Sequence, residues 1–322
     1  MSVGTGTGPL ELVDAVCCNC GETDASVPLA VGEDFEYRTS PDTFTMYRCQ
    51  RCDVIFLDPR PAHTELGRIY GPNYHAYNFD EGSFGLSYKV RAWLETKRIM
   101  DWCADLPPNA RILDIGAGDG FHLKLLRQAG KPTWKMEAVE PDAKAAGAAA
   151  AAGLFVHRGF VEDLELEPGS YDFVIMIMTI EHVADPVQIL KRARELLRPG
   201  GRLGIVTDNT AAPDAIFGRG RHWGGYHFPR HFYLFNRRSL AKLASLAGFE
   251  VDRMGTMLSP VNWTYTFHNA LEDWGAPRWI VNRFSLESAP ALAIFSVVDY
   301  FAGLFGRGAL LRAVLRRPWD SR

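Results

Sequence analysis

Short apolar segments alternate with helix-like segments throughout residues 111–207, and this alternation constrains the fold more than any other feature of the chain. Residues 171–178 (YDFVIMIM) are almost continuously apolar, which is typical of a strand buried on both faces of a parallel sheet. Similar strands are predicted on either side of it, at 111–115, 134–139, 154–158 and 202–207. The alternation predicts an α/β fold with a doubly wound parallel sheet, in which ligands bind at the carboxyl ends of the strands.

A glycine-rich turn follows the first of these strands. Gly116, Gly118 and Gly120 permit a tight turn and let a ligand approach the backbone closely. The spacing is G-x-G-x-G, without the third glycine at the position that a dinucleotide-binding loop requires, and Asp114 lies inside the strand. The turn therefore predicts a ligand site but does not by itself identify the ligand.

Glu140 ends the second strand, roughly 20 residues after this turn. An acidic side chain at that place can accept hydrogen bonds from both hydroxyls of a ribose. The alternative is that Glu140 only favours the start of the alanine-rich helix predicted at 143–152, because the helix dipole attracts an anion there.

Two C-x2-C pairs lie near the N-terminus, Cys17 with Cys20 and Cys49 with Cys52. Four thiolates at this spacing predict a closed, structural Zn²⁺ site, with no open position for water and with room for a β-hairpin between the pairs. Two alternatives stay open. Either Cys18 replaces Cys17 as a ligand, or the cysteines form two reactive pairs or remain buried thiols.

The charge of the chain is nearly balanced. Its 322 residues include 35 lysines and arginines against 38 aspartates and glutamates, for a net charge of −3. This balance provides no field to hold a polyanion, so nucleic acid is not an expected partner. The first fifteen residues have neither the basic start nor the apolar run of a signal peptide, so we expect a cytoplasmic protein with reduced thiols.

Five segments carry a resemblance to a known enzyme family: LDIGAGDGFHL (113–123), VEP (139–141), VED (161–163), YDFVIMIMTIEHVADP (171–186) and LLRPGGRLGIVT (196–207). Their order and spacing resemble those of class I S-adenosylmethionine (SAM)-dependent methyltransferases. The cysteine pairs, with FLDPRP (56–61) and YGPNYHAY (70–77), are similar to a bacterial subgroup with an N-terminal zinc ribbon that modifies sugars, lipid-linked glycans or natural products. The resemblance implies a Rossmann-like sheet of seven strands and SAM as the cofactor.

The resemblance also implies roles for residues around the cofactor. Gly116 and Gly118 would face the methionine part of SAM, and Glu140 would accept the ribose hydroxyls. Asp163 would accept the adenine amino group. The other cofactor-pocket residues that it implies are Asp114, Glu162, Met178, Tyr74 and Tyr77.

Methyl transfer to a hydroxyl also needs a group that takes the hydroxyl proton, and histidine suits this because its pKa lies near neutrality. His182 follows the fourth strand, and His222, His227 and His231 lie in one loop after the fifth. We expect His231 to be the general base, with His182 and then His227 as the next candidates. The alternative is that these histidines only pack and close the loop. A metal site is disfavoured, because a loop with glycines and proline does not present them on one helix face.

Aromatic side chains are frequent between residues 255 and 308, which predicts a helical insertion that forms either a lid or acceptor platform, or a helical cover for the sheet. Residues 289–305 are apolar but short for a bilayer span, and Asp299 lies among them, so we expect a core or interfacial helix. The resemblance favours a final strand at 310–317. The alternative is a basic turn that contacts an anionic membrane, which would make the protein membrane-associated.

These expectations divide the chain into four regions. They are a flexible tail (1–16), a zinc-ribbon module (17–60), a connector with a helix at 84–104 that covers the SAM site (61–108), and a SAM-binding domain (109–322) whose loop 208–235 and insertion 255–308 form the acceptor side.

The predicted activity is SAM-dependent O-methylation of a hydroxyl on a sugar, a glycan or a glycosylated natural product, with a small-molecule or glycan acceptor as the partner. A first alternative is C- or N-methylation of a small-molecule or lipid-linked acceptor. Alternatives from other classes are a zinc-ribbon RNA-binding methyltransferase or adaptor, and a catalytically silent SAM-binding protein. The complete set of Gly116, Gly118, Glu140 and Asp163 argues against the last of these.

Overall fold

Seven strands form one sheet in the computed structural model, which describes residues 8–71 and 81–319. They are β6 (Arg111–Ile115), β7 (Lys135–Glu140), β8 (Phe155–Arg158), β9 (Tyr171–Ile177), β10 (Leu197–Asp208), β12 (Glu250–Met257) and β13 (Leu310–Arg316). Their order across the sheet is β12-β13-β10-β9-β6-β7-β8. Neighbours from β10 to β8 pair in parallel, whereas β13 is antiparallel to both β10 and β12. The predicted seven-stranded, Rossmann-like sheet is confirmed.

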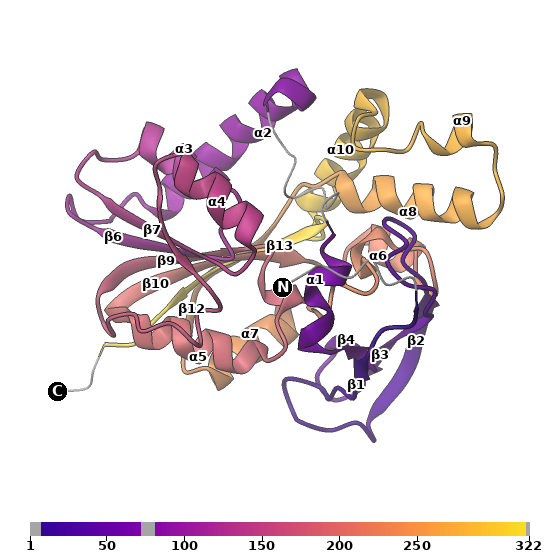
Figure 1. Ribbon diagram of the computed structural model, residues 1–322, viewed down its shortest axis with the longest axis horizontal. Helices are drawn as coiled ribbons and strands as arrows, with labels where there is room; N and C mark the ends of the chain where they lie inside the picture. Colours follow the sequence, from indigo (N-terminus) through magenta and orange to yellow (C-terminus); the bar gives the residue numbers. More distant parts are fainter. Residues whose placement is uncertain (1–7, 72–80, 320–322) are drawn as a thin grey trace.

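Helices cover both faces of this sheet (Figure 1). One face carries α2 (Glu81–Trp102), α3 (Phe121–Ala129) and α4 (Ala143–Ala151), and the other carries α5 (Pro186–Leu196) and α7 (Arg237–Leu246). Side chains of β9 point alternately into the two hydrophobic cores on either side of the sheet. Phe173 and Ile175 pack in the core with α2, α3 and α4, and Val174 and Met176 pack in the core with α5 and α7. A strand buried on both faces is apolar at nearly every position, which explains the uninterrupted apolar run.

Polar side chains cap three of these helices. Asp142 caps α4, Asp185 caps α5 and Asn236 caps α7, each accepting hydrogen bonds from backbone N–H groups of the first turn. A cap sets the residue at which a helix begins, so these three residues also set where the preceding loops at the carboxyl edge of the sheet end.

The N-terminal module has a four-stranded antiparallel sheet in the order β11-β4-β3-β2. Three of its strands are β2 (Ser26–Gly32), β3 (Phe44–Cys49) and β4 (Ile55–Leu57), and β2 with β3 is the hairpin expected between the cysteine pairs. The fourth, β11 (Tyr233–Leu234), belongs to the loop that carries three of the histidines. Backbone hydrogen bonds therefore join the module to the larger domain.

The segment before the first cysteine differs from the predicted flexible tail (1–16) in its described part. β1 (Leu12–Val13) pairs with β5 (Arg60–Pro61), and Leu10 and Ala15 are buried. Residues 8–16 are ordered because these apolar side chains join the hydrophobic core that the module shares with the sheet domain. The connector that follows contains η1 (His63–Glu65) and α1 (Leu66–Ile69).

The helical insertion lies between the last two strands in sequence. It contains α8 (Val261–Asp273), α9 (Arg278–Val281) and α10 (Ala289–Leu304), and it begins later than expected because β12 extends to Met257. Rings of Trp263, Phe267, Phe284 and Phe295 form a small aromatic core, with centroids 5.2 to 6.5 Å apart. Within the described ranges, no helix has the length and apolar character needed to span a bilayer.

The predicted final strand is confirmed, and the alternative of a basic turn there is wrong. β13 lies inside the sheet, between β10 and β12. Arg316 pairs with Glu250 of β12 at 3.4 Å, and Arg317 donates a 2.6 Å hydrogen bond to the Leu197 carbonyl. These two arginines therefore fasten the strand to its neighbours.

A buried ion pair connects the module to the histidine loop. Arg230 and Asp34 are both fully buried, and the guanidinium donates hydrogen bonds of 3.1 and 2.9 Å to the two carboxylate oxygens. The same guanidinium donates to the backbone carbonyls of Ile69 and Phe228, at 2.8 and 2.9 Å. Burial alone would raise the pKa of Asp34, but the hydrogen bonds and charge of Arg230 hold it below its ordinary value.

Arg230→Met is expected to destabilise the protein by about 3–5 kcal/mol, because it leaves the buried Asp34 carboxylate without its partner. Arg38→Met is the matched control, since Arg38 pairs with Glu272 through a side chain that is 71% exposed. Urea denaturation of the two variants measures the difference. Equal losses of unfolding free energy in the two variants would show that the buried pair does not hold the module in place.

Candidate active site

The glycine turn between β6 and α3 has the backbone that its sequence predicts. Gly116, Gly118 and Gly120 have φ of +76°, +56° and +79°, where a side chain is strained. The N–H groups of Gly116 and Ala117 both donate to the Val139 carbonyl, which fixes the turn against β7. No described atom lies within 4 Å of the place where a Cβ of Gly118 would project, so the turn faces open space there.

Glu140 contacts this turn directly. Its carboxylate accepts a 2.8 Å hydrogen bond from the Gly118 N–H and a 2.9 Å hydrogen bond from the Asp142 N–H. Burial raises the pKa of Glu140 even though these two N–H groups act in the opposite direction. Asp142 caps α4 with its side chain, and Glu140 accepts from the N–H of this cap residue, so Glu140 contacts both the glycine turn and the start of α4.

Asp114 is 1% exposed, and among the described residues nothing hydrogen-bonds to its Oδ2. Burial, together with the charges of Glu140 and Asp119, raises the pKa of Asp114 to about 8. An unpartnered buried carboxylate oxygen is costly. Its presence beside the turn is consistent with a ligand group that pairs with it.

Three of the remaining predicted cofactor residues follow the ends of β8 and β9. Met178 directly follows β9 with φ +52°, and its N–H donates to the Val206 carbonyl. Glu162 and Asp163 are exposed in the loop after β8. Tyr74 and Tyr77 lie outside the described residues.

Three histidines meet at the carboxyl ends of β9 and β10. His182 lies in η3 (Ile180–His182), and its ring centroid is 4.6 Å from that of His231 and 6.4 Å from that of His227. The latter two follow η4 (Gly224–Tyr226), with centroids 5.0 Å apart. His222 lies apart and pairs instead with Asp273 at 2.8 Å.

His231 is buried and electrically neutral. Its Nδ1 lies 2.8 Å from the Gly225 carbonyl, so Nδ1 carries the proton and Nε2 the lone pair. Burial, followed by the nearby His182 and His227, lowers the pKa of His231 well below 6.5. This is the protonation state that a proton acceptor requires.

Two buried carboxylates beside these histidines were missed by the sequence reasoning. Glu181 accepts a 2.9 Å hydrogen bond from the Thr207 hydroxyl, and Asp208 accepts a 2.6 Å hydrogen bond from the Asn262 amide. Burial is the main cause that raises the pKa of both carboxyls. Glu181 precedes His182, and Asp208 ends β10. Their position at the carboxyl edge of the sheet, where ligands bind, is the sequence signal that could have identified them as site residues.

The N-terminal part of the chain also reaches this cluster. Glu36, from the loop after β2, is 2.8 Å from His227 Nδ1, and both side chains are 7% exposed. The Tyr70 hydroxyl is 2.8 Å from His182 Nδ1. No local pattern predicts the first contact, because 191 residues separate its two partners.

This cluster also contains a candidate set of metal ligands. Ligand atoms of Glu181, His182 and His231 all lie within 4.8 Å of one another. The arrangement therefore has the donor types of a divalent cation site as well as those of an acid–base site.

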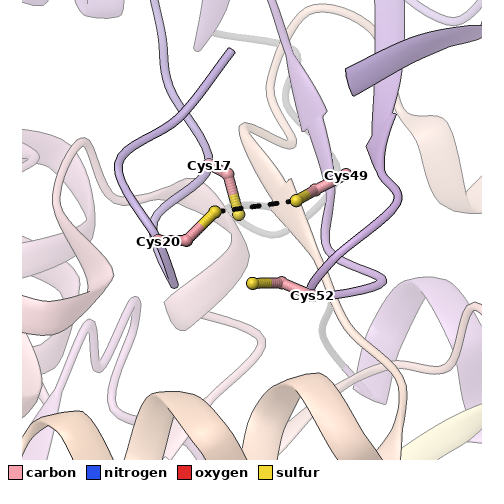
Figure 2. Close-up of side chains that lie close together, drawn as sticks. All are labelled: Cys17, Cys20, Cys49 and Cys52. Atoms are coloured by element: carbon pink, nitrogen blue, oxygen red, sulfur yellow. Dashed lines mark hydrogen bonds between the residues drawn. The ribbon is translucent and has the colours of Figure 1, made fainter. Parts of the chain in front are cut away.

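The four paired cysteines come together in the module, and Figure 2 shows their side chains pointing toward one another. Their sulfurs all lie within 4.8 Å, and the Cys20 and Cys49 sulfurs are 3.7 Å apart. Cys18 is not in this group, which favours Cys17 over Cys18 as the candidate metal ligand. The Lys242 ammonium of α7 lies 3.1 Å from the Cys52 sulfur.

The profile of a family described as methyltransferase domain matches residues 87–253. A ubiquinone biosynthesis O-methyltransferase of Cereibacter sphaeroides is 30% identical over 184 residues, 52% of this chain and 71% of that protein. An uncharacterized 37.1 kDa protein in a transposon of Streptomyces fradiae is 34% identical over 153 residues, 45% of this chain and 43% of that protein. Phosphoethanolamine N-methyltransferase 2 of Haemonchus contortus, solved with S-adenosyl-L-methionine, has a similar fold, with a TM-score of 0.53 and 17% identity over 92% of this chain and 70% of that one.

Gly116→Ala is expected to cost more stability than Gly118→Ala. A side chain at either positive φ costs roughly 1–2 kcal/mol. At Gly116 the new Cβ would also lie 2.6 Å from Thr179 Cγ2, which adds about 1–3 kcal/mol of overpacking. Urea denaturation compares the two variants, and equal midpoints would contradict this difference in packing.

Proposed function

Because the chain belongs to the class I SAM-dependent methyltransferase family, we propose that it methylates a hydroxyl oxygen of a sugar, a glycan or a glycosylated natural product, with a buried histidine as general base. The observation that carries this proposal is the cluster of histidines and carboxylates at the carboxyl edge of the sheet, next to the glycine turn. Thr179 links the two, because its side chain fills the space beside Gly116 and His182 follows three residues later.

The residues around the turn fit SAM, which supplies a methyl group on a positively charged sulfonium. Gly118 leaves open space, and the unpartnered Oδ2 of Asp114 is a buried acceptor for a cationic or donor group. Glu140 ends β7, where an acidic side chain accepts ribose hydroxyls in sheets of this type. The turn has no lysine that could bind a phosphate, and SAM has no phosphate group. The rest of the proposed set is Gly116, Asp163, Glu162 and Met178, with Tyr74 and Tyr77 from the connector.

His231 is the proposed base because its surroundings prepare it to accept a proton. Its Nδ1–H is held by the Gly225 carbonyl, which leaves Nε2 for the acceptor hydroxyl. When the ring takes that proton, Asp208 Oδ2 lies 3.4 Å from Nδ1 and can stabilise the positive charge. His182 and His227 are the next candidates, positioned by Tyr70 and Glu36 respectively.

A polyhydroxylated acceptor suits the polar groups around this base. Glu181 and Asp208 each keep one carboxylate oxygen that has no hydrogen bond from the described residues. Each can accept a hydrogen bond from an acceptor hydroxyl, which would orient the oxygen that is methylated. The O-methyltransferase name of the Cereibacter relative supports oxygen as the methylated atom. The near-balanced charge supports a sugar-like acceptor over RNA.

His231→Gln is expected to lower the single-turnover rate by about 10²–10⁴-fold, the usual contribution of a general base. The loss of rate that comes from protonation of His231 should set in only below pH 6.5. The reason is that a base remains neutral above its own pKa, and the pKa of His231 lies well below 6.5. Mass spectrometry of a panel of glycans incubated with SAM, read as a gain of one methyl group, measures the rate.

His222→Gln is the control for this series, because His222 pairs with Asp273 away from the cluster. This variant should methylate at the wild-type rate. Histidine base catalysis is wrong if His231→Gln and His182→Gln both keep the wild-type rate. A methyl group found on nitrogen or carbon would replace the O-methylation proposal, and salt-sensitive RNA binding would replace the sugar-like acceptor. Loss of activity with EDTA, restored by a divalent cation, would assign Glu181, His182 and His231 to a metal.

We also propose that Cys17, Cys20, Cys49 and Cys52 hold a structural Zn²⁺. Zinc–sulfur bonds of about 2.3 Å in a tetrahedron place neighbouring sulfurs about 3.8 Å apart. The Cys20–Cys49 distance of 3.7 Å supports this arrangement. Lys242 beside Cys52 partly offsets the charge of four thiolates.

Cys49→Ser is expected to abolish stoichiometric zinc and to lower the melting temperature by at least about 5 °C, because the module loses the ion that fixes its two loops. Cys18→Ser is the matched control and should retain one zinc per chain, since Cys18 lies outside the cluster. Elemental analysis of the purified proteins and thermal denaturation measure the two effects. Absence of zinc from the wild type, or equal loss in both variants, would contradict the proposed ligand set.

A further inference from the structure

α10 carries a continuous apolar stripe on its solvent side. The exposed fractions of Ile294, Phe301 and Phe305 are 61%, 56% and 82%. The stripe, which we call the α10 face, consists of Ile294, Val297, Val298, Phe301, Leu304 and Phe305. Their spacing of three and four residues places them along one side of the helix. A contiguous exposed apolar surface of this kind marks an interaction site.

The helix cannot rotate to bury this stripe, because its opposite side is already fixed. Phe295 stacks on Trp263 at 5.8 Å and on Phe267 at 5.2 Å. Asp299 is the only charged residue within 289–305, and its buried carboxylate accepts hydrogen bonds from the N–H groups of Ser259 (2.8 Å) and Ala309 (2.9 Å). These contacts hold α10 on α8 and on the start of β13. The α10 face therefore remains outward.

The residues on either side of α10 have the composition of a membrane–water interface. Between residues 274 and 309 the exposed charges are Arg278, Arg283 and Arg307 against the single acid Glu287. Trp274 and Trp279 are 72% and 66% exposed, and the Arg283 guanidinium lies 6.0 Å from the Trp279 ring centroid. Tryptophan and arginine are the residues that favour the headgroup level of a bilayer, next to apolar side chains that enter it.

We propose that the α10 face docks on an anionic bilayer surface, with the helix lying in the interface and the flanking arginines contacting the headgroups. The apolar side chains supply the burial and the arginines the attraction to anionic lipid. A symmetric dimer through the same face is less favourable, since it would bring arginines of both copies to one surface. The proposal is independent of the acceptor of methyl transfer.

The position of the insertion gives this docking a consequence for the site. α8, which carries α10 on one side, packs on η4 on the other, and its Asn262 donates to Asp208 in the histidine cluster. Figure 1 shows α8, α9 and α10 grouped together beside the sheet. Docking would therefore place the acceptor side near the membrane surface. A lipid-linked acceptor would be within reach from there.

The test is co-sedimentation of the full chain with vesicles of phosphatidylcholine alone and of phosphatidylcholine with phosphatidylglycerol. The wild type should bind the anionic vesicles, and the Phe301→Glu/Phe305→Glu double variant should bind them at least about tenfold more weakly. Arg283→Gln should weaken binding to the anionic vesicles by about fivefold and leave binding to neutral vesicles unchanged. Phe155→Glu is the control, because the 63% exposure of Phe155 lies between those of Phe301 (56%) and Phe305 (82%), and Phe155 is on the edge strand β8.

Circular dichroism and melting temperature confirm that each variant is folded, which is expected because the substituted side chains are exposed. Failure of the folded wild type to bind anionic vesicles overturns the proposal. Equal weakening by Phe155→Glu also overturns it, because binding would then not depend on the α10 face. Sedimentation velocity that shows a wild-type dimer, converted to monomer by the double variant without vesicle binding, would assign the face to a second copy of the chain instead.

Discussion

The candidate active site depends on one buried ion pair that joins segments far apart in the chain. Arg230 immediately precedes the candidate base His231, and its guanidinium is held by Asp34 from the N-terminal module. The same guanidinium bonds to the carbonyl of Ile69 in the connector. A buried pair contributes little net stability, because desolvation of both charges offsets most of their attraction. What it supplies here is position, since the guanidinium binds the module, the connector and its own loop at the same time.

The consequence is a cluster of histidines and carboxylates assembled from four parts of the chain. The end of β10 contributes Asp208, and η3, which follows β9, contributes Glu181 and His182. The loop after β10 contributes the other two clustered histidines. The module contributes Glu36 against His227, and the insertion contributes Asn262 against Asp208. The cysteine cluster lies in the same module as Glu36, whose side chain contacts His227.

Asp299 illustrates how tertiary contacts change the meaning of a sequence feature. In the sequence it interrupts an apolar stretch of residues 289–305 and argues against a membrane span. In the structure its carboxylate is buried and binds backbone N–H groups of Ser259 and Ala309, so it anchors one side of α10 while the other side stays apolar and exposed. The charge thus fixes which side of the helix is available to a partner.

Features that depend on neighbouring residues could be predicted from the sequence. The apolar run of β9, the positive-φ glycines of the turn, Glu140 at the end of β7 and the two C-x2-C pairs all follow from local backbone and ligand chemistry. The long-range contacts were decided only in three dimensions: Glu36 with His227, Arg230 with Asp34, and the packing of residues 8–16 that replaces the predicted tail. The physical reason is that burial, and with it the pKa of His231 and the pairing of each buried charge, depends on which distant segments exclude water.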